Sequence, residues 1–237
     1  MSATVIIPTT GSKDLKKAID SVLSQSYPTD CYLVVDGKKF DYDTLKIIQD
    51  NNYTDNPKFK CCVLPINVGA GGFYGHRIYA AFTHLINTDY VLYLDQDNWF
   101  EKEHVQSCIA AIKENNADWS YSLRNIYEND VFVCQDNCES LGKWQTYHGA
   151  NHIDTNSYCV KTQVAIKLAN AWHGGWGQDR VFFHNLANYF KNFVCTGEYT
   201  VNYRVGGNAG SVTTDFFKNG NAIMNGRYNG VFPWTKH

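Results

Sequence analysis

Short apolar runs that alternate with helical stretches constrain the fold of this chain most strongly. The runs occupy residues 4–7, 32–35, 61–64 and 90–94, and the stretch at 15–23 repeats its apolar residues at helical spacing. Buried strands that alternate with helices are typical of βαβ units. We therefore predict an α/β fold with a mainly parallel central sheet flanked by helices.

The second half of the sequence is less regular. We expect a hairpin formed by residues 119–126 and 131–135, a further strand at 157–160, and helices at about 77–86, 102–115, 163–171 and 179–189. The tail from Gly206 is rich in Gly and Asn, so we expect a loop or lid there, with a short helix near 215–218.

No linker interrupts the sequence, so we expect one domain over residues 1–237. Within it we place a ligand-binding half at about 1–98, a second half at about 99–205, and the C-terminal tail at 206–237. One sizeable core is what a chain of 237 residues supports.

Charge and cysteine content exclude several classes of protein. The net charge is -2 and no long basic run occurs, which argues against nucleic-acid binding. No apolar run is long enough to span a membrane, and the N-terminus does not resemble a secretory signal. We therefore interpret the eight cysteines, which include no CxxC pair, as reduced thiols in a cytoplasmic protein.

Polar residues follow each of the four predicted strands. They are Pro8-Thr9-Thr10, Asp36-Gly37, Asn67-Val68-Gly69 and Asp95-Gln96-Asp97. In open α/β sheets, ligands bind beyond the carboxyl ends of the strands. We therefore expect these four segments to share one binding rim.

The segment Asp95-Gln96-Asp97 suggests a metal site. Residues i and i+2 of an extended chain point to the same side, so the two carboxylates can share one hard cation. Mg²⁺ and Mn²⁺ prefer oxygen ligands and leave positions open for substrate phosphates. The alternative is a turn with two solvated aspartates.

Two further features suit a nucleotide. Asp36 can accept a hydrogen bond from a base N–H, although an Asp-Gly turn explains it equally well. The glycine-rich segment 67–77 fits neither a P-loop nor a dinucleotide fingerprint. Its glycines still permit close approach of a ligand, and Arg77 can pair with a diphosphate. The alternative is a flexible loop with a surface arginine.

Asp179 is a candidate general base. It follows Trp176 and Gly177 at the predicted start of a helix, where a simple N-cap is the ordinary explanation. Trp176 offers an apolar platform for a sugar face. His148 and His152 lie near Asp154 in sequence and are candidates to line the same site.

The ordered motifs resemble family-2 glycosyltransferases of the GT-A fold. The resemblance covers about residues 3–205 and rests on Val5-Ile6-Ile7-Pro8-Thr9-Thr10, Ala18-Ile19-Asp20-Ser21-Val22-Leu23-Ser24-Gln25-Ser26-Tyr27-Pro28, Val34-Val35-Asp36-Gly37, Asn67-Val68-Gly69, Asp95-Gln96-Asp97 and Trp176-Gly177-Gln178-Asp179. It implies a metal-dependent, inverting glycosyltransferase that uses a nucleoside-diphosphate sugar, with a UDP-sugar as the expected donor and a glycan or another hydroxyl compound as the acceptor.

The resemblance also implies a role for individual residues. Asp179 is the expected catalytic base, and Asp97, with Asp95, is the expected ligand of Mn²⁺ or Mg²⁺. The expected donor-binding residues are Pro8, Thr9, Asp36, Asn67, Gly69, Arg77, Asp95 and Gln96. The expected acceptor-binding residues are Asp154, Asn156, Trp176 and Gln178.

Two departures from the family pattern matter. Gln178 stands where the family usually has a glutamate, so one carboxylate is missing beside Asp179. The family often has a histidine soon after a Tyr-Arg pair, but no histidine follows Tyr203-Arg204 up to Ser211. Water is then the expected third metal ligand.

Two alternative functions remain open on the sequence. One is a catalytically silent nucleotide-sugar or carbohydrate-binding module with the same fold. The other is a sugar-phosphate nucleotidylyltransferase, although residues 8–13 lack the arginine of its basic N-terminal signature. Neither the oligomeric state nor the identity of the sugar follows from the sequence.

Overall fold

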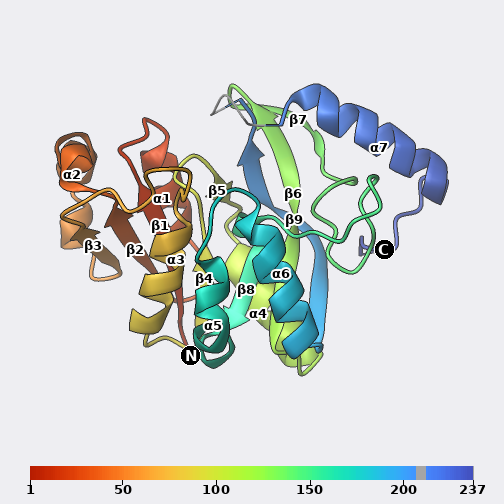
Figure 1. The fold of residues 1–237 in the computed structure, drawn as a ribbon, viewed down its shortest axis with the longest axis horizontal. Coiled ribbons are helices and arrows are strands. Elements are labelled where there is room, and N and C mark those ends of the chain that lie inside the picture. Colours follow the sequence, from red (N-terminus) through yellow and green to blue (C-terminus); the bar gives the residue numbers. More distant parts are fainter. Residues whose placement is uncertain (207–211, 237) are drawn as a thin grey trace.

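The computed structural model describes residues 1–206 and 212–236. Within them, nine strands form one sheet in the order β3-β2-β1-β4-β8-β6-β9-β5, and β7 pairs with β6 outside this path (Figure 1). The strands are β1 (Ala3–Thr9), β2 (Thr29–Val35), β3 (Phe59–Val63), β4 (Tyr90–Tyr93), β5 (Trp99–Phe100), β6 (Trp119–Glu128), β7 (Val131–Gln135), β8 (Tyr158–Lys161) and β9 (Phe193–Arg204).

Helices connect most of the strands. The α-helices are α1 (Leu15–Leu23), α2 (Asp41–Asp50), α3 (His76–Phe82), α4 (His104–Glu114), α5 (Thr162–Leu168), α6 (Gln178–Tyr189) and α7 (Thr214–Tyr228). Short 3-10 turns are η1 (Lys38–Phe40), η2 (Tyr53–Asp55), η3 (Thr83–Leu85), η4 (Thr155–Ser157) and η5 (Ala169–Trp172).

The sheet changes character at β4. Strands β3, β2, β1 and β4 are parallel, whereas β8 is antiparallel to both β4 and β6. Strand β9 returns parallel to β6. The carboxyl ends of the parallel strands therefore meet at one edge, and the antiparallel part brings a second set of loops toward it. The architecture confirms the predicted α/β fold with a mainly parallel sheet.

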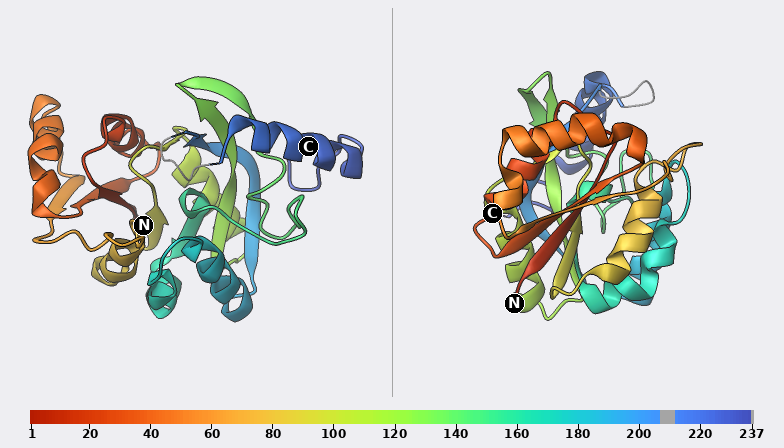
Figure 2. Two further views of the ribbon diagram at one scale, coloured as in Figure 1. Left: turned by 45° about the horizontal axis from the view of Figure 1, so that its top comes forward. Right: turned by 90° about the vertical axis from the view of Figure 1, so that its left-hand side faces the viewer.

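Alternating side chains of β1 build two cores. Val5 and Ile7 pack with α1 and α4 on one face, whereas Ile6 packs with α3, α5 and α6 on the other. Figure 2 shows helices on both sides of the strands in its right view. Residues i and i+2 of a strand share a face, so an unbroken apolar run such as β1 indicates burial on both sides.

The tail forms a longer helix than the sequence suggests. Our expectation of a loop with a short helix at 215–218 is wrong, because α7 spans Thr214–Tyr228. Phe217 and Met224 anchor α7 in a third core with β6 and β9. Gly220 permits this packing, since a Cβ there would lie 2.7 Å from Cys138 Sγ. Part of the expected loop, residues 207–211, lies outside the described residues.

The remaining element predictions hold with small shifts of their ends. The hairpin of β6 and β7 and helices α3 to α6 appear where the patterns placed them. Strand β9 has no counterpart among the sequence predictions. No helix among the described residues has the length and apolar character needed to span a membrane.

Candidate functional site

A cavity of about 510 Å³ opens where the carboxyl ends of the parallel strands face the loops of the second half. Most of the predicted site residues line it, namely Pro8, Thr9, Asp36, Asn67, Gly69, Asp95, Gln96, Asp97, Asp154, Trp176 and Asp179. The polar segments after the four parallel strands therefore share one rim, as the sequence predicts.

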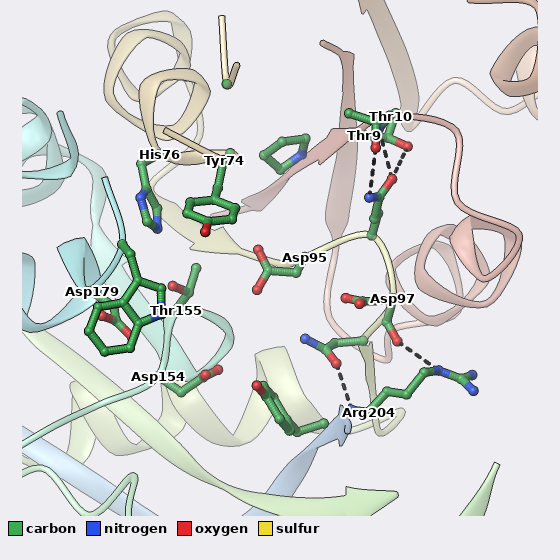
Figure 3. A pocket seen from close by; sticks show the side chains of 18 of the residues that line it. Thr9, Thr10, Tyr74, His76, Asp95, Asp97, Asp154, Thr155, Asp179 and Arg204 are labelled. Carbon is green, nitrogen blue, oxygen red and sulfur yellow. Dashed lines mark hydrogen bonds between the residues drawn. The ribbon is translucent and has the colours of Figure 1, made fainter. Parts of the chain in front are cut away.

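Gln96 fastens the loop after β1. Its Oε1 atom accepts hydrogen bonds from Thr9 Oγ1 at 2.7 Å, the Thr10 amide at 2.9 Å and the Ser12 amide at 3.3 Å. Its Nε2 atom donates to Thr10 Oγ1 at 3.2 Å (Figure 3). One neutral side chain thus fixes the conformation of the loop that borders the cavity.

Asp36 fastens the glycine-rich loop in a similar way. Its two carboxylate oxygens accept hydrogen bonds from the amides of Val68, at 2.7 Å, and Gly69, at 2.9 Å. A Cβ at residue 69 would lie 2.1 Å from the Tyr74 carbonyl oxygen and 2.6 Å from Asp36 Oδ2, so only glycine fits. Asp36 therefore orders the rim, whatever else it contacts there.

Asp95 points into the cavity and is held from two sides. Its carboxylate accepts hydrogen bonds from the Tyr79 hydroxyl at 2.8 Å and Asn156 Nδ2 at 3.1 Å. Burial raises the pKa of Asp95 to about 7, and the negative charges of Asp97 and Asp154 add to this rise. A cation at this point would relieve that repulsion.

Asp97 also faces the cavity (Figure 3). Burial raises the pKa of its carboxyl group, with Asp14 adding to the rise, while the nearby Arg204 guanidinium lowers it. Arg204 itself is shared by Asp14, at 3.3 Å, and Asp130, at 2.8 Å. Its Nε atom also donates to the Asp97 carbonyl oxygen at 3.4 Å.

The chemistry of these carboxylates fits a hard divalent cation in part. Oxygen ligands suit Mg²⁺ and Mn²⁺, and Asp97 has no hydrogen-bond donor from another side chain among the described residues. Within the same part of the chain, no three His, Cys, Asp or Glu side chains are grouped closely enough to hold a metal ion. Substrate phosphates and water would have to complete the coordination shell.

Asp179 lies across the cavity, in the first turn of α6. The helix begins after Gly177, so Asp179 does not cap it, and its Oδ1 atom accepts a hydrogen bond from the Arg180 amide at 2.9 Å. Its side chain is 21% exposed. Burial raises the pKa of Asp179, and the adjacent His152 lowers it. A partly exposed carboxylate of raised proton affinity is suited to general-base chemistry.

A buried cluster of charges stands behind Asp179. Arg124, on β6, is 1% exposed and pairs with Asp136 at 2.7 Å, Asp154 at 2.8 Å and Glu139. His152 Nε2 lies 3.1 Å from Glu139 Oε1 and 3.5 Å from Asp179 Oδ2. We call these six residues the charge cluster.

Three predicted site residues do not line the cavity. The Arg77 guanidinium stacks 3.3 Å from the centre of the Phe73 ring and donates to the Val68 carbonyl at 3.2 Å. Gln178 Nε2 donates to the Ala171 carbonyl at 2.6 Å. Asn156 is buried behind Asp95, to which it donates. Their contacts with a ligand remain predictions. In the structure these three side chains support the fold around the cavity.

Several cavity residues were not among the predicted site residues. They include Tyr74, His76, Arg124, Glu139, Tyr203 and Arg204. His152, suggested by its proximity to Asp154 in sequence, lines the cavity, whereas His148 does not belong to the lining residues. A buried arginine in the middle of a strand is rarely unpaired, and that was the one sequence signal that Arg124 offered.

The model of the family described as glycosyl transferase family 2 matches residues 4–190. Solved structures of residues 1–349 of S. aureus TarS are similar in fold. The TarS chain alone is 16% identical, with a TM-score of 0.67 over 86% of this chain and 60% of that one. The complex with UDP-GlcNAc is 17% identical, with a TM-score of 0.67 over 94% of this chain and 65% of that one.

The chain thus spans less than two thirds of the length of these TarS structures. No curated protein matches the sequence. The family model, however, extends from the first strand to the end of α6 and so includes both walls of the cavity. On this match and this fold, the chain belongs to glycosyl transferase family 2.

Proposed function

We propose that this protein transfers a sugar from a nucleoside-diphosphate sugar to a hydroxyl group of a glycan or similar acceptor, with inversion at the anomeric carbon. Membership of glycosyl transferase family 2 supports the reaction class. The TarS structure of similar fold, which was solved with UDP-GlcNAc, supports a UDP-sugar as the donor.

One observation carries the proposal. A single cavity has Asn67, Asp95 and Asp97 on the wall formed by the parallel strands, and Asp179 on the opposite wall. This arrangement offers a site for a nucleotide diphosphate opposite a carboxylate that can accept a proton. Direct displacement needs those two functions on opposite sides of the reacting carbon.

The residues then have separate tasks. Asp179 takes the proton from the acceptor hydroxyl as the hydroxyl oxygen forms a bond to the anomeric carbon. The bond from that carbon to the phosphate oxygen breaks, and the nucleoside diphosphate leaves with the electron pair. The Trp176 side chain, 74% exposed at the rim, offers a face on which a sugar ring can stack.

A divalent cation, Mn²⁺ or Mg²⁺, forms part of the proposal. Asp97 would hold it, with Asp95 as a second ligand. When bound, it would supply positive charge to the leaving diphosphate. The raised pKa values of both carboxyl groups agree with a site that is short of positive charge on its own.

We further propose that the protein works in the cytoplasm, where nucleotide sugars would be its donors. All eight cysteines are free thiols, which suits a reducing compartment. The acceptor is a hydroxyl-bearing glycan or glycosylated molecule in this proposal.

The test is release of nucleotide from UDP-GlcNAc, UDP-glucose, GDP-mannose and dTDP-glucose, with Mn²⁺ present and with glycan acceptors added. We expect the protein to turn over a UDP-sugar, and D179N to lower kcat by about 1000-fold with donor affinity unchanged. The control is D50N, the same change at an exposed aspartate on α2.

Other outcomes would point to the alternatives. Tight donor binding without turnover by any donor would indicate a binding module. Formation of a nucleotide sugar from UTP and a sugar 1-phosphate would indicate a nucleotidylyltransferase. Full activity of D179N would show that the base lies elsewhere.

A further inference from the structure

His152 occupies an unusual position for a histidine. It is 5% exposed, and its Nε2 atom faces two carboxylates, Glu139 Oε1 at 3.1 Å and Asp179 Oδ2 at 3.5 Å. Carboxylate oxygens only accept, so the two contacts are attractive when Nε2 carries a proton, and they become ion pairs when the ring is protonated on both nitrogens. The imidazole therefore connects the candidate base to a second carboxylate that does not itself contact the base.

Glu139 is held firmly enough to fix the ring. Its second carboxylate oxygen pairs with Arg124, and its amide donates to Asp136 Oδ1 at 2.9 Å. Arg124 in turn pairs with Asp136 and Asp154. The histidine is thus a member of the charge cluster and the one that contacts Asp179.

His152 is not placed to react with a substrate itself. Its Nδ1 atom is buried and has no hydrogen-bond partner among the described residues. Its Nε2 atom is occupied by Glu139 and Asp179. We therefore expect its effect on the reaction to pass through Asp179, which it contacts.

We propose that His152 is a positioning residue for Asp179: its Nε2 atom lies 3.5 Å from Asp179 Oδ2 while the Arg180 amide donates to Oδ1, and the contact with Glu139 keeps the ring in place. This inference rests on the proposed function, because it gives Asp179 the part of proton acceptor. It adds a histidine, a glutamate and an arginine to the machinery around that base.

The electrostatics agree with the geometry. Burial disfavours the charged ring, but Glu139 outweighs it and raises the pKa of His152. Burial also raises the pKa of Asp179, as do Asp154 and Glu139, and His152 is the main group that lowers it. His76 and Tyr158 also lie close enough to Asp179 to feel its charge; burial lowers the pKa of His76 and raises that of Tyr158. Without the imidazolium, Asp179 would therefore retain its proton to higher pH.

The first experiment does not depend on turnover. The imidazole signals of the full chain are titrated by ¹H–¹⁵N NMR, with His152 assigned by its absence in H152Q. We expect His152 to titrate above the ordinary histidine value in the wild type, and at lower pH in both D179N and E139Q. A titration at the ordinary value, or one that neither substitution moves, would overturn the proposal.

The second experiment measures nucleotide release from the donor that the wild type turns over, as a function of pH. The acid limb of the profile, where activity falls with pH, marks protonation of Asp179. Because H152Q keeps an N–H donor but not the charge, this limb should move to higher pH by about one unit. H152A should lose about 100-fold in kcat with the KM for the donor unchanged. H184Q, at an exposed position on α6, is the matched control.

The outcomes separate the two hypotheses. If the wild type releases no nucleotide from any donor, the proposed function fails, and the NMR titration still decides the place of His152. If the wild type is active but H152Q and H152A keep its pH profile, the positioning role is refuted. The positioning role is supported if H152A loses kcat, H152Q restores part of it, and the acid limb of H152Q moves to higher pH. A purely structural role would not move the pH profile.

Discussion

The two walls of the cavity are held in place by different forces. On the wall after the parallel strands, Gln96 and Asp36 fix two loops through main-chain amides and a threonine hydroxyl. On the opposite wall, Arg124 and His152 are surrounded by four carboxylates. On the first wall, burial raises the pKa values of Asp95 and Asp97, whereas the carboxylates of the second wall are paired with Arg124 and His152.

The difference suggests how each substrate is received. A nucleotide diphosphate is strongly charged, so a wall of oriented amides with a place for a metal ion suits it. A neutral hydroxyl acceptor needs a base with a controlled proton affinity, and fixed charges supply that control. We expect the first wall to govern donor binding and the second to govern both stability and kcat.

The largest effect should come from the second wall. R124M would leave Asp136, Glu139 and Asp154 buried without their shared cation, and the loss of one partner of a buried ion pair costs about 3–5 kcal/mol. Urea denaturation would measure this loss. R227M, which removes an exposed arginine on α7, is the control and should change stability by about 0.5 kcal/mol or less. Equal stabilities for the two variants would mean that the second wall is not held by charge.

The next effect should appear on the first wall. D97N removes the carboxylate that has no partner from another side chain among the described residues, so activity should fall by about 100-fold. Titration with Mn²⁺ should stimulate the wild type and leave D97N unchanged. Chelation by EDTA should reduce the wild type to the level of the variant. Undiminished Mn²⁺ stimulation in D97N would remove Asp97 from the metal site.

A smaller effect should follow from Gln96. Q96L would leave the Thr10 and Ser12 amides without their acceptor, and the loop after β1 should loosen. We expect the KM for the donor to rise about tenfold with kcat little changed. Q49L, on the exposed side of α2, is the matched control. A fall in kcat without a change in KM would show that the loop serves the reaction and not the binding step.

The smallest effect should be a dependence of stability on pH with opposite signs for Asp95 on the first wall and Glu139 on the second. Asp95 has a raised pKa of about 7, so in the absence of metal its ionisation destabilises the fold, and stability should rise as pH falls through 7. Glu139 has a pKa below its ordinary 4.5, because His152 and Arg124 outweigh its burial, so its contribution is lost below that pH.

Thermal denaturation in EDTA between pH 8 and pH 3 would test both signs. We expect the midpoint temperature to change by about 2–4 °C for each kcal/mol by which either carboxyl group changes the free energy of unfolding. D95N should flatten the limb near neutrality, and E139Q should flatten the acid limb. A midpoint that falls steadily from pH 8 would contradict the sign expected for Asp95.

The first wall could be predicted from strand patterns, and Asp154, Trp176 and Asp179 of the second wall were also named, but Arg124 and Glu139 were not. Apolar runs reveal strands, and the carboxyl ends of parallel strands must meet, so sequence patterns alone suffice to place Asp36, Asn67 and Asp97 on one rim. Glu139 lies in an irregular loop and Arg124 within a strand, so no periodicity connects them. Their proximity depends on the register of β6 with its neighbours, which sequence patterns do not fix.

Side-chain direction was the other limit. Gln178 and Asp179 are adjacent, yet one donates to the Ala171 carbonyl and the other faces the cavity. Arg77 was expected to pair with phosphate, but Phe73 offered a flat ring four residues earlier in the same loop. Neighbours along the helix of α6 or the start of α3 diverge by a large angle, and a motif alone does not say which of them points inward.

The junction of β4 and β8 has a consequence for motion. Because this antiparallel pairing makes one continuous sheet of both halves, the described part of the chain has no hinge about which one half can swing over the other. The distance between the two walls is therefore set by the backbone hydrogen bonds of the sheet and not by an equilibrium between open and closed domains. Any opening and closing during a catalytic cycle must then come from short segments at the mouth. The loop that carries Gly71 and Gly72 is one such segment, because it has open space around it: a Cβ at either residue would have no other atom within 4 Å.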